Sequence, residues 1–95
     1  MDRLAKINRI LDSCLTTETL DRIYPFEKKI EETLLTEDEV RDRHRLVQID
    51  LLELVNKTLT SELGEKVEGD TFKVVYNRIG QFLFKHNIKS FLSHE

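Results

Sequence analysis

Apolar side chains recur every three or four residues along most of this chain, and that spacing places them on one face of an α-helix. The pattern divides into four principal helices, predicted at about residues 2–15, 17–35, 37–62 and 71–92. Short connections between such helices suit antiparallel neighbours. The sequence therefore predicts an all-α fold, a compact antiparallel bundle of about four helices that forms a single domain over residues 1–95.

Pro25 interrupts the second of these helices. A proline inside a helix removes one backbone hydrogen bond and clashes with the preceding turn, whereas the first position of a new helix tolerates it. We therefore expect the second helix to kink or to restart at Tyr24 and Pro25.

A capping box at residues 36–39, Thr-Glu-Asp-Glu, predicts where the third helix begins. The Thr36 hydroxyl can accept from the amide of Glu39, while the Glu39 carboxylate accepts from the amide of Thr36. The helix that follows has a seam resembling that of a coiled coil, made of Val40, His44, Val47, Leu51, Leu54 and Thr58. Further apolar residues beside this seam favour a bundle core over a two-stranded zipper. Gly64 is a natural end for the helix.

Residues 64–70, Gly-Glu-Lys-Val-Glu-Gly-Asp, form the loop before the last helix. Asp70 can cap a helix whose apolar stripe begins at Phe72. Alternatively, residues 64–75 form a β-hairpin, because the stretch VEGDTFKVV has a turn between short runs that favour strands. The long helical stripe that follows favours the loop and helix.

The last helix changes its apolar face near its end. One broad stripe is formed by Phe72, Val75, Tyr76, Ile79, Phe82, Leu83 and His86. Phe84, Ile88 and Phe91 lie on a different face. Either a partner covers this second face, or the chain bends at Asn87 and folds the face back onto the bundle. Asparagine tolerates the left-handed conformation that such a bend needs.

Composition and charge narrow the range of functions. Hydrophobic residues are 39% of the chain and charged residues 35%, enough for a core with a densely charged surface. Residues 70–95 have a net charge of +2 and the first 69 residues one of −5, which gives −3 overall. General affinity for nucleic acid needs clustered basic residues, so direct nucleic-acid binding is less favoured than protein binding. Arg41, Arg43 and Arg45 are the alternative charged contact, with phosphates or an acidic protein.

Candidate catalytic and metal-binding residues are few. The soft metal ligands are His44, His86, His94 and Cys14, and none of them forms a close pair on one helical face. We expect His44 to lie at the edge of the seam beside a carboxylate, and Cys14 to be a buried thiol. No phosphate-binding glycine motif occurs. The sequence thus predicts a protein that is not an enzyme, with no catalytic, metal or cofactor site and no small-molecule substrate.

The location of the protein follows from the same inventory. A single cysteine and the lack of a basic and apolar leader predict a cytoplasmic protein. No run of apolar residues approaches the roughly 18 that a membrane span needs, so we expect no membrane partner.

Three short stretches resemble pieces of a known family. TTETLDRI at residues 16–23, LTEDEV at 35–40 and RHRL at 43–46 are similar to segments of the Hha/YmoA proteins, in the same order, and cover about a fifth of the chain. Those proteins are small, helical and bacterial, and they modulate transcription by binding a nucleoid-structuring partner through charge. The resemblance implies such a role here. Residues 24–28 look inserted and everything after about Ser61 has no counterpart, so no functional residue is carried over.

These patterns together predict a non-catalytic regulatory, adaptor or inhibitor protein that binds another protein, or a second copy of itself, through a helical apolar face. The predicted contact residues are Phe84, Lys85, Ile88, Lys89 and Phe91. Exposed aromatic and aliphatic side chains ringed by lysine are typical of such interfaces. The alternative is a nucleoid-associated or transcription-modulating factor that acts through its basic residues or through a partner bound to DNA.

Overall fold

The computed structural model of the protein describes residues 2–88. It contains α1 (Arg3–Cys14), α2 (Thr17–Ile23), α3 (Phe26–Glu31), the 3₁₀-helix η1 (Glu32–Leu34), α4 (Glu37–Leu63) and α5 (Asp70–Lys85). All regular structure in these residues is helical, which confirms the all-α prediction. The hairpin alternative for residues 64–75 is wrong, because α5 begins at Asp70 with Gly69 as its N-cap.

Polar side chains cap three of the helices where they begin. Asp2 caps α1, Thr16 caps α2 and Thr36 caps α4, each by accepting a hydrogen bond from a backbone amide of the first turn. At α4 the amide of Thr36 also donates to the Glu39 carboxylate at 2.8 Å, which completes the predicted capping box. The helix ends at Gly64, whose φ of 72° is a left-handed conformation that glycine adopts at little cost.

The second predicted helix, over residues 17–35, is replaced by α2, α3 and η1. Tyr24 and Pro25 both lie outside the helical region of backbone conformation. Tyr24 has φ −139° and ψ 80°, and Pro25 has φ −68° and ψ 163°. Proline excludes its preceding residue from the helical region, so α2 ends before it and α3 begins after it. With 7 and 6 residues, α2 and α3 are each too short to pack along the length of α4 as a fourth helix of a bundle.

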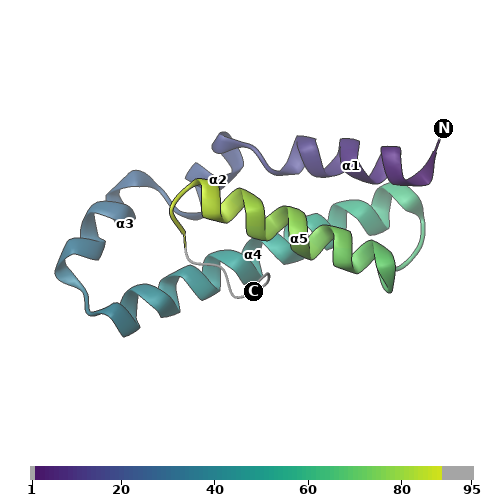
Figure 1. The fold of residues 1–95 in the computed structure, drawn as a ribbon. Coiled ribbons are helices and arrows are strands. Elements are labelled where there is room, and N and C mark those ends of the chain that lie inside the picture. The colour runs from purple at the N-terminus through teal and green to yellow at the C-terminus, as the bar shows by residue number, and fades with distance from the viewer. Residues whose placement is uncertain (1, 89–95) are drawn as a thin grey trace.

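The helix α4, with 27 residues, is the element on which the others are arranged. α1 and α5 pack against it and against each other, and α2 also contacts it. Both α1 and α5 run opposite to α4 and therefore parallel to each other (Figure 1). The expected antiparallel bundle of four helices is thus corrected to three packed helices, α1, α4 and α5, with α2 beside them. The remaining pieces, α3 and η1, form an arm that arches around the N-terminal end of α4 (Figure 1).

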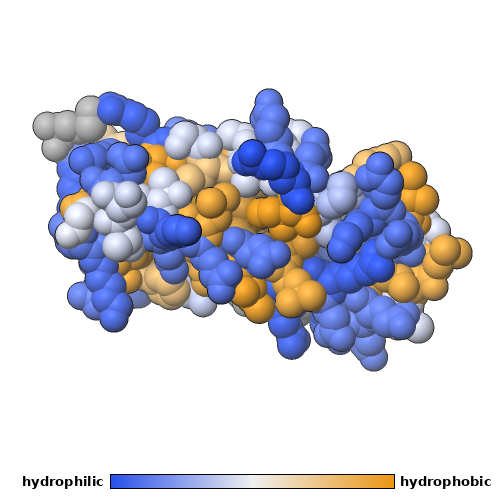
Figure 2. Space-filling model, turned by 180° about the vertical axis from the view of Figure 1, so that it is seen from behind, coloured by the Kyte–Doolittle hydropathy of each residue, from blue (hydrophilic) through white to orange (hydrophobic). Residues whose placement is uncertain are grey.

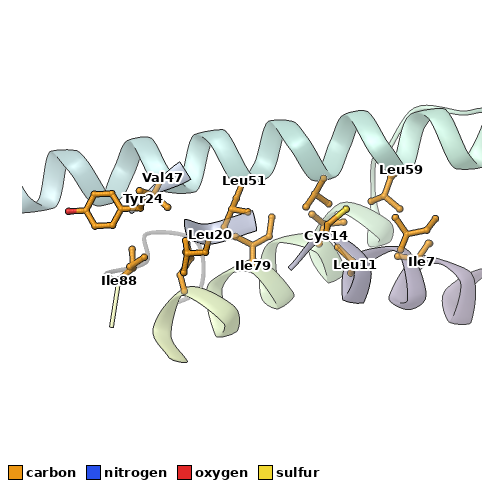
Figure 3. Packing of buried hydrophobic residues seen from close by; sticks show 14 residues of the cluster. Ile7, Leu11, Cys14, Leu20, Tyr24, Val47, Leu51, Leu59, Ile79 and Ile88 are labelled. Carbon is orange, nitrogen blue, oxygen red and sulfur yellow. The ribbon is translucent and has the colours of Figure 1, made fainter. Parts of the chain in front are cut away.

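The hydrophobic core runs along the whole of this packed layer. It consists of Ile7, Ile10, Leu11, Cys14, Leu20, Tyr24, Val47, Leu51, Val55, Leu59, Val75, Ile79, Leu83 and Ile88. Tyr24, Val47 and Ile88 gather at one end, and Ile7 and Leu59 lie at the other (Figure 3). Each fully buried leucine or isoleucine stabilises the fold by about 1.5–3 kcal/mol relative to exposure. No residue of α3 or η1 belongs to this core.

The C-terminal end of α5 is a Schellman motif, and it stops the helix at Lys85, short of the predicted residue 92. The amide of Ile88 donates to the carbonyl of Leu83 at 2.9 Å, and the amide of Asn87 donates to that of Phe84 at 3.1 Å. Asn87 occupies the left-handed position, with φ 60°. This turn directs Ile88 into the core, where it contacts solvent with 1% of its surface.

Asn87 is therefore the residue whose substitution most directly tests the turn. Asn87→Val places a β-branched side chain in the left-handed region, and we expect it to lower the free energy of unfolding by about 1–2 kcal/mol. Asn87→Gly is the matched control and should leave that free energy equal or slightly higher. Urea unfolding followed by circular dichroism measures both. A valine variant as stable as the wild type would show that the turn at Asn87 is not formed in solution.

Candidate protein-binding surfaces

The described residues offer little to support chemistry. No group of three or more histidine, cysteine, aspartate or glutamate side chains lies close enough to hold a metal ion within residues 2–88. Cys14 is buried in the core, as predicted. In the same part of the chain, no helix is long and apolar enough to cross a membrane.

The predicted contact residues at the end of the chain are divided by the fold. Phe84 is 81% exposed and Lys85 is exposed, as the prediction requires. Ile88 is a correction: the Schellman turn buries it against the core, so it is not available to a partner. Lys89 and Phe91, together with His94, lie outside the described residues.

Phe84 and Lys85 line a groove between the end of α1 and the last turns of α5. The groove has a volume of about 490 Å³ and is lined by Asp12, Leu15, Arg78, Gln81, Phe82, Phe84 and Lys85. We call it the α5 groove. Its aromatic and aliphatic side chains give it an apolar floor, and Arg78 and Lys85 give it a basic edge. Volumes of this size, within roughly 300–1,000 Å³, are typical of binding clefts.

Arg78 holds the two walls of the α5 groove together. From α5 its guanidinium donates to Asn8 Oδ1 at 2.7 Å and to Asp12 Oδ1 at 2.5 Å, both on α1. This pair of contacts fixes the separation of the helices, so the groove exists before any partner arrives. The Asp12 carboxylate offsets the charge of Arg78, whereas Lys85 makes no ion pair with any residue in the described part of the chain.

A second apolar surface lies on the arm. Phe26, Ile30 and Leu34, spaced four residues apart, are 71%, 54% and 85% exposed. We call these three residues the α3 ridge. Hydrophobic atoms gather at the end of the molecule that the arm forms (Figure 2, right). Full burial of each such side chain contributes about 1.5–3 kcal/mol, so a partner that covers the ridge would gain binding free energy from it.

Polar contacts from α4 and α5 hold the arm in place. The Arg43 guanidinium forms an ion pair with Glu31 at 3.0 Å and donates to the carbonyl of Lys28 at 3.3 Å. The ammonium of Lys29 donates to the carbonyl of His86 at 2.7 Å, at the C-terminal end of α5 where a positive charge is favoured. These bonds fix the inner side of α3 and leave the α3 ridge on its outer side.

The innermost of these contacts is a cluster of the buried Tyr24 and His44 with the partly buried Glu32. The Tyr24 hydroxyl donates to Glu32 Oε2 at 2.5 Å, and His44 Nε2 lies 2.9 Å from the same oxygen. The rings of Tyr24 and His44 meet edge to face, with centroids 5.8 Å apart. The prediction that His44 pairs with a carboxylate is confirmed. Since the partner is in η1, this cluster joins the arm to α2 and α4.

The cluster shifts the pKa values of two of its members. Burial is the main cause that raises the pKa of Tyr24 to about 12, and the hydrogen bond to Glu32 and its negative charge add to it. Burial also acts to raise the pKa of Glu32. Hydrogen bonds from Tyr24 and His44 and the nearby charges of His44 and Lys29 outweigh it, so the pKa of Glu32 is lowered. The cluster thus favours a neutral phenol beside an ionised carboxylate.

The three arginines of the alternative contact do not form one open basic face. Arg41 pairs with Asp38 at 3.1 Å, and Arg43 is bound to Glu31 on the arm. Arg45 also has an interaction partner within the protein. Arg43 in particular is a structural residue of the arm, since it bonds both a side chain and a carbonyl of α3.

The α3 ridge is surrounded by negative charge. Residues 25–39, from the proline to the end of the capping box, contain six acidic and two basic side chains, a net charge of −4. Glu31 is paired with Arg43, and Glu27 is next to Phe26 of the ridge in the sequence. The two exposed apolar surfaces of the protein therefore differ in electrostatics: the ridge is acidic and the α5 groove has a basic edge.

Reasoning from the sequence missed the α3 ridge. A second helix that continued from residue 17 to residue 35 would place Ile30 and Leu34 on one stripe with Leu20, facing the core. A signal was present, because Phe26, Ile30 and Leu34 repeat at four residues immediately after Pro25, as on a short independent helix.

Comparison with known proteins adds no assignment. No family model, curated protein or solved structure matches this chain. The Hha/YmoA resemblance stays a hypothesis that rests on the three short stretches of sequence.

The shifted pKa of Tyr24 makes a prediction about alkaline pH. In Tyr76→Phe, where Tyr24 is the remaining tyrosine, ultraviolet absorbance should show the phenol ionising near pH 12 instead of its ordinary 10. The pKa of Tyr24 is higher in the folded than in the unfolded protein. The contribution of Tyr24 to the free energy of unfolding is therefore fully present below pH 10 and is lost as the pH rises toward 12.

Glu32→Gln is the matched variant. It removes the negative charge beside Tyr24, so the ionisation should move downward while staying above the ordinary value, since burial is the larger cause. Circular dichroism recorded in parallel shows whether the chain is still folded. Ionisation of Tyr24 at its ordinary pKa in the folded wild type would contradict the cluster.

At acid pH the carboxylate of Glu32 has the opposite effect. Because its pKa is lowered in the folded protein, its contribution to stability is lost as the pH falls through the folded-state pKa.

Proposed function

We propose that this is a non-catalytic regulatory or adaptor protein that binds an acidic amphipathic helix in the α5 groove. The observation that supports the proposal best is Phe84, an aromatic side chain that is 81% exposed on the wall of a preformed groove. A large exposed aromatic residue beside a concave surface is typical of a protein-binding hot spot.

The lining of the α5 groove indicates the chemistry of its partner. Leu15, Phe82 and Phe84 offer apolar contact, and Arg78 and Lys85 stand at the edge. An amphipathic helix meets such a groove with apolar residues spaced at three and four positions, and its flanking carboxylates meet the basic edge. Because Arg78 already fixes α1 against α5, little ordering is needed when the partner binds, which favours affinity.

The predicted role of Ile88 changes within this proposal. Ile88 supports the surface from below, since its burial anchors the turn that ends α5 next to Phe84. Lys85 is the member of the predicted set that offers an unpaired positive charge within the described residues. The function is therefore assigned to Phe84 and Lys85 together with residues of α1 that the sequence did not indicate.

A synthetic helical peptide with a leucine stripe flanked by glutamates tests this function. We expect it to perturb the amide resonances of Leu15, Gln81 and Phe84 in NMR spectra of the labelled protein. Phe84→Ser should weaken its affinity about tenfold or more, since central aromatic contacts contribute more than about 1 kcal/mol. The stability of that variant should change by less than about 0.5 kcal/mol, because Phe84 is exposed.

Two controls make the result specific. Leu46→Ser removes another exposed apolar side chain, on α4, and should leave the peptide affinity unchanged. A peptide with lysine in place of each glutamate should bind more weakly, because it opposes Lys85 and Arg78. Equal binding by wild type and Phe84→Ser, or perturbations confined to other surfaces, would contradict the proposal.

A further inference from the structure

We infer that the α3 ridge of one copy of this protein occupies the α5 groove of another copy. The inference rests on the proposed function, because it takes the α5 groove as a binding site and names what fills it. The partner is then a second copy of this chain.

The two surfaces have complementary shape and composition. The α3 ridge is a row of three exposed apolar side chains, two on α3 and one at the end of η1. The α5 groove is a hollow of about 490 Å³ whose lining includes Leu15, Phe82 and Phe84. Apolar side chains of a helix can pack into a hydrophobic groove of a partner.

Their charges are also complementary. Glu27 is next to Phe26 of the ridge, in a segment of net charge −4, whereas Lys85, which has no ion pair within the described residues, stands at the edge of the groove. The same asymmetry runs through the whole sequence, since residues 70–95 carry +2 and residues 1–69 carry −5. Contact between opposite surfaces brings unlike charges together, whereas ridge against ridge or groove against groove brings like charges together.

Within one copy the ridge and the groove cannot meet. The Lys29–His86 and Arg43–Glu31 contacts hold α3 by its inner side, and Phe26 and Leu34 remain exposed on the outer side. The contact must therefore form between molecules. Such a contact, between unlike surfaces of two copies, builds either a reciprocal two-fold symmetric pair or a longer head-to-tail assembly. Three side chains make a small contact, so we expect association to depend on concentration.

The test uses two full-length variants, each of which disables one surface. Ile30→Asp disrupts the ridge and Phe84→Asp disrupts the groove, and both residues are exposed, so the fold should be retained. Sedimentation of wild type should show a mass above that of a monomer and rising with concentration. Each variant alone should sediment as a monomer, with a circular dichroism spectrum equal to that of wild type.

Mixing the two variants is the decisive step. Each variant keeps the surface that the other lacks, so one ridge-to-groove contact can form between them. An equimolar mixture should therefore form a heterodimer and no larger assembly. Labelling one variant with a fluorophore identifies the mixed species. Leu46→Asp, an exposed site on α4, is the control and should assemble as wild type does.

Every other outcome overturns the inference. Monomeric wild type at all concentrations removes self-association. Assembly that survives Phe84→Asp indicates a ridge-to-ridge contact, and assembly that survives Ile30→Asp indicates a groove-to-groove contact. A mixture that stays monomeric excludes the ridge-to-groove contact. If wild type is monomeric and yet binds the acidic peptide through Phe84, the self-recognition fails and the proposed function stands; if the peptide also fails to bind, both fail.

Discussion

The carboxylate of Glu32 is the contact on which the position of the arm, and with it the α3 ridge, depends. It accepts from the hydroxyl of Tyr24 at 2.5 Å and lies 2.9 Å from His44, and so joins the arm to α2 and to the N-terminal part of the long helix α4. The arm contributes no residue to the hydrophobic core. Its position is therefore set by polar contacts: the Glu32 cluster, the ion pair of Glu31 and the bond from Lys29 to the end of α5.

This way of holding the arm explains why apolar side chains stand in solvent. A helix normally buries its apolar stripe because burial is what fixes it to the protein. In α3 the inner side is fixed by charged and polar groups, so Phe26, Ile30 and Leu34 are left on the outside. Holding the ridge rigidly before it meets a partner reduces the entropy lost on binding. The contacts of Arg78 with Asn8 and Asp12 hold α5 against α1 and so keep the α5 groove in shape. Both surfaces are therefore ordered before binding.

Much of the fold is local in the sequence and could be predicted from it. The capping box at Thr36, the stop at Gly64 and the left-handed Asn87 are each decided by neighbouring residues. The direction of the arm is not local. Glu32 meets a residue 12 positions away and Lys29 meets one 57 positions away, and no repeat of apolar residues indicates either pairing. The four-residue spacing of Phe26, Ile30 and Leu34 is the same whether the stripe faces core or solvent, so the spacing alone does not reveal the ridge.

The end of α5 shows the same limit in a milder form. The second apolar face was visible in the sequence, and Asn87 was visible as a place to bend. Whether Phe84 and Ile88 are both exposed or both buried depends on the turn between them. The Schellman bonds separate them, sending Ile88 inward and leaving Phe84 on the α5 groove. A stripe defined by spacing alone could not distinguish the two residues.

Amide hydrogen exchange of dilute, monomeric protein tests most directly whether polar contacts hold the arm. In wild type, amides of α3 such as those of Lys28 and Lys29, which donate to the carbonyl of Pro25, should be protected. In Glu32→Gln that protection should fall, while amides of the core residues Val55 and Ile79 keep theirs. An arm that is unprotected in wild type, or one whose protection is unchanged in Glu32→Gln, would contradict the account.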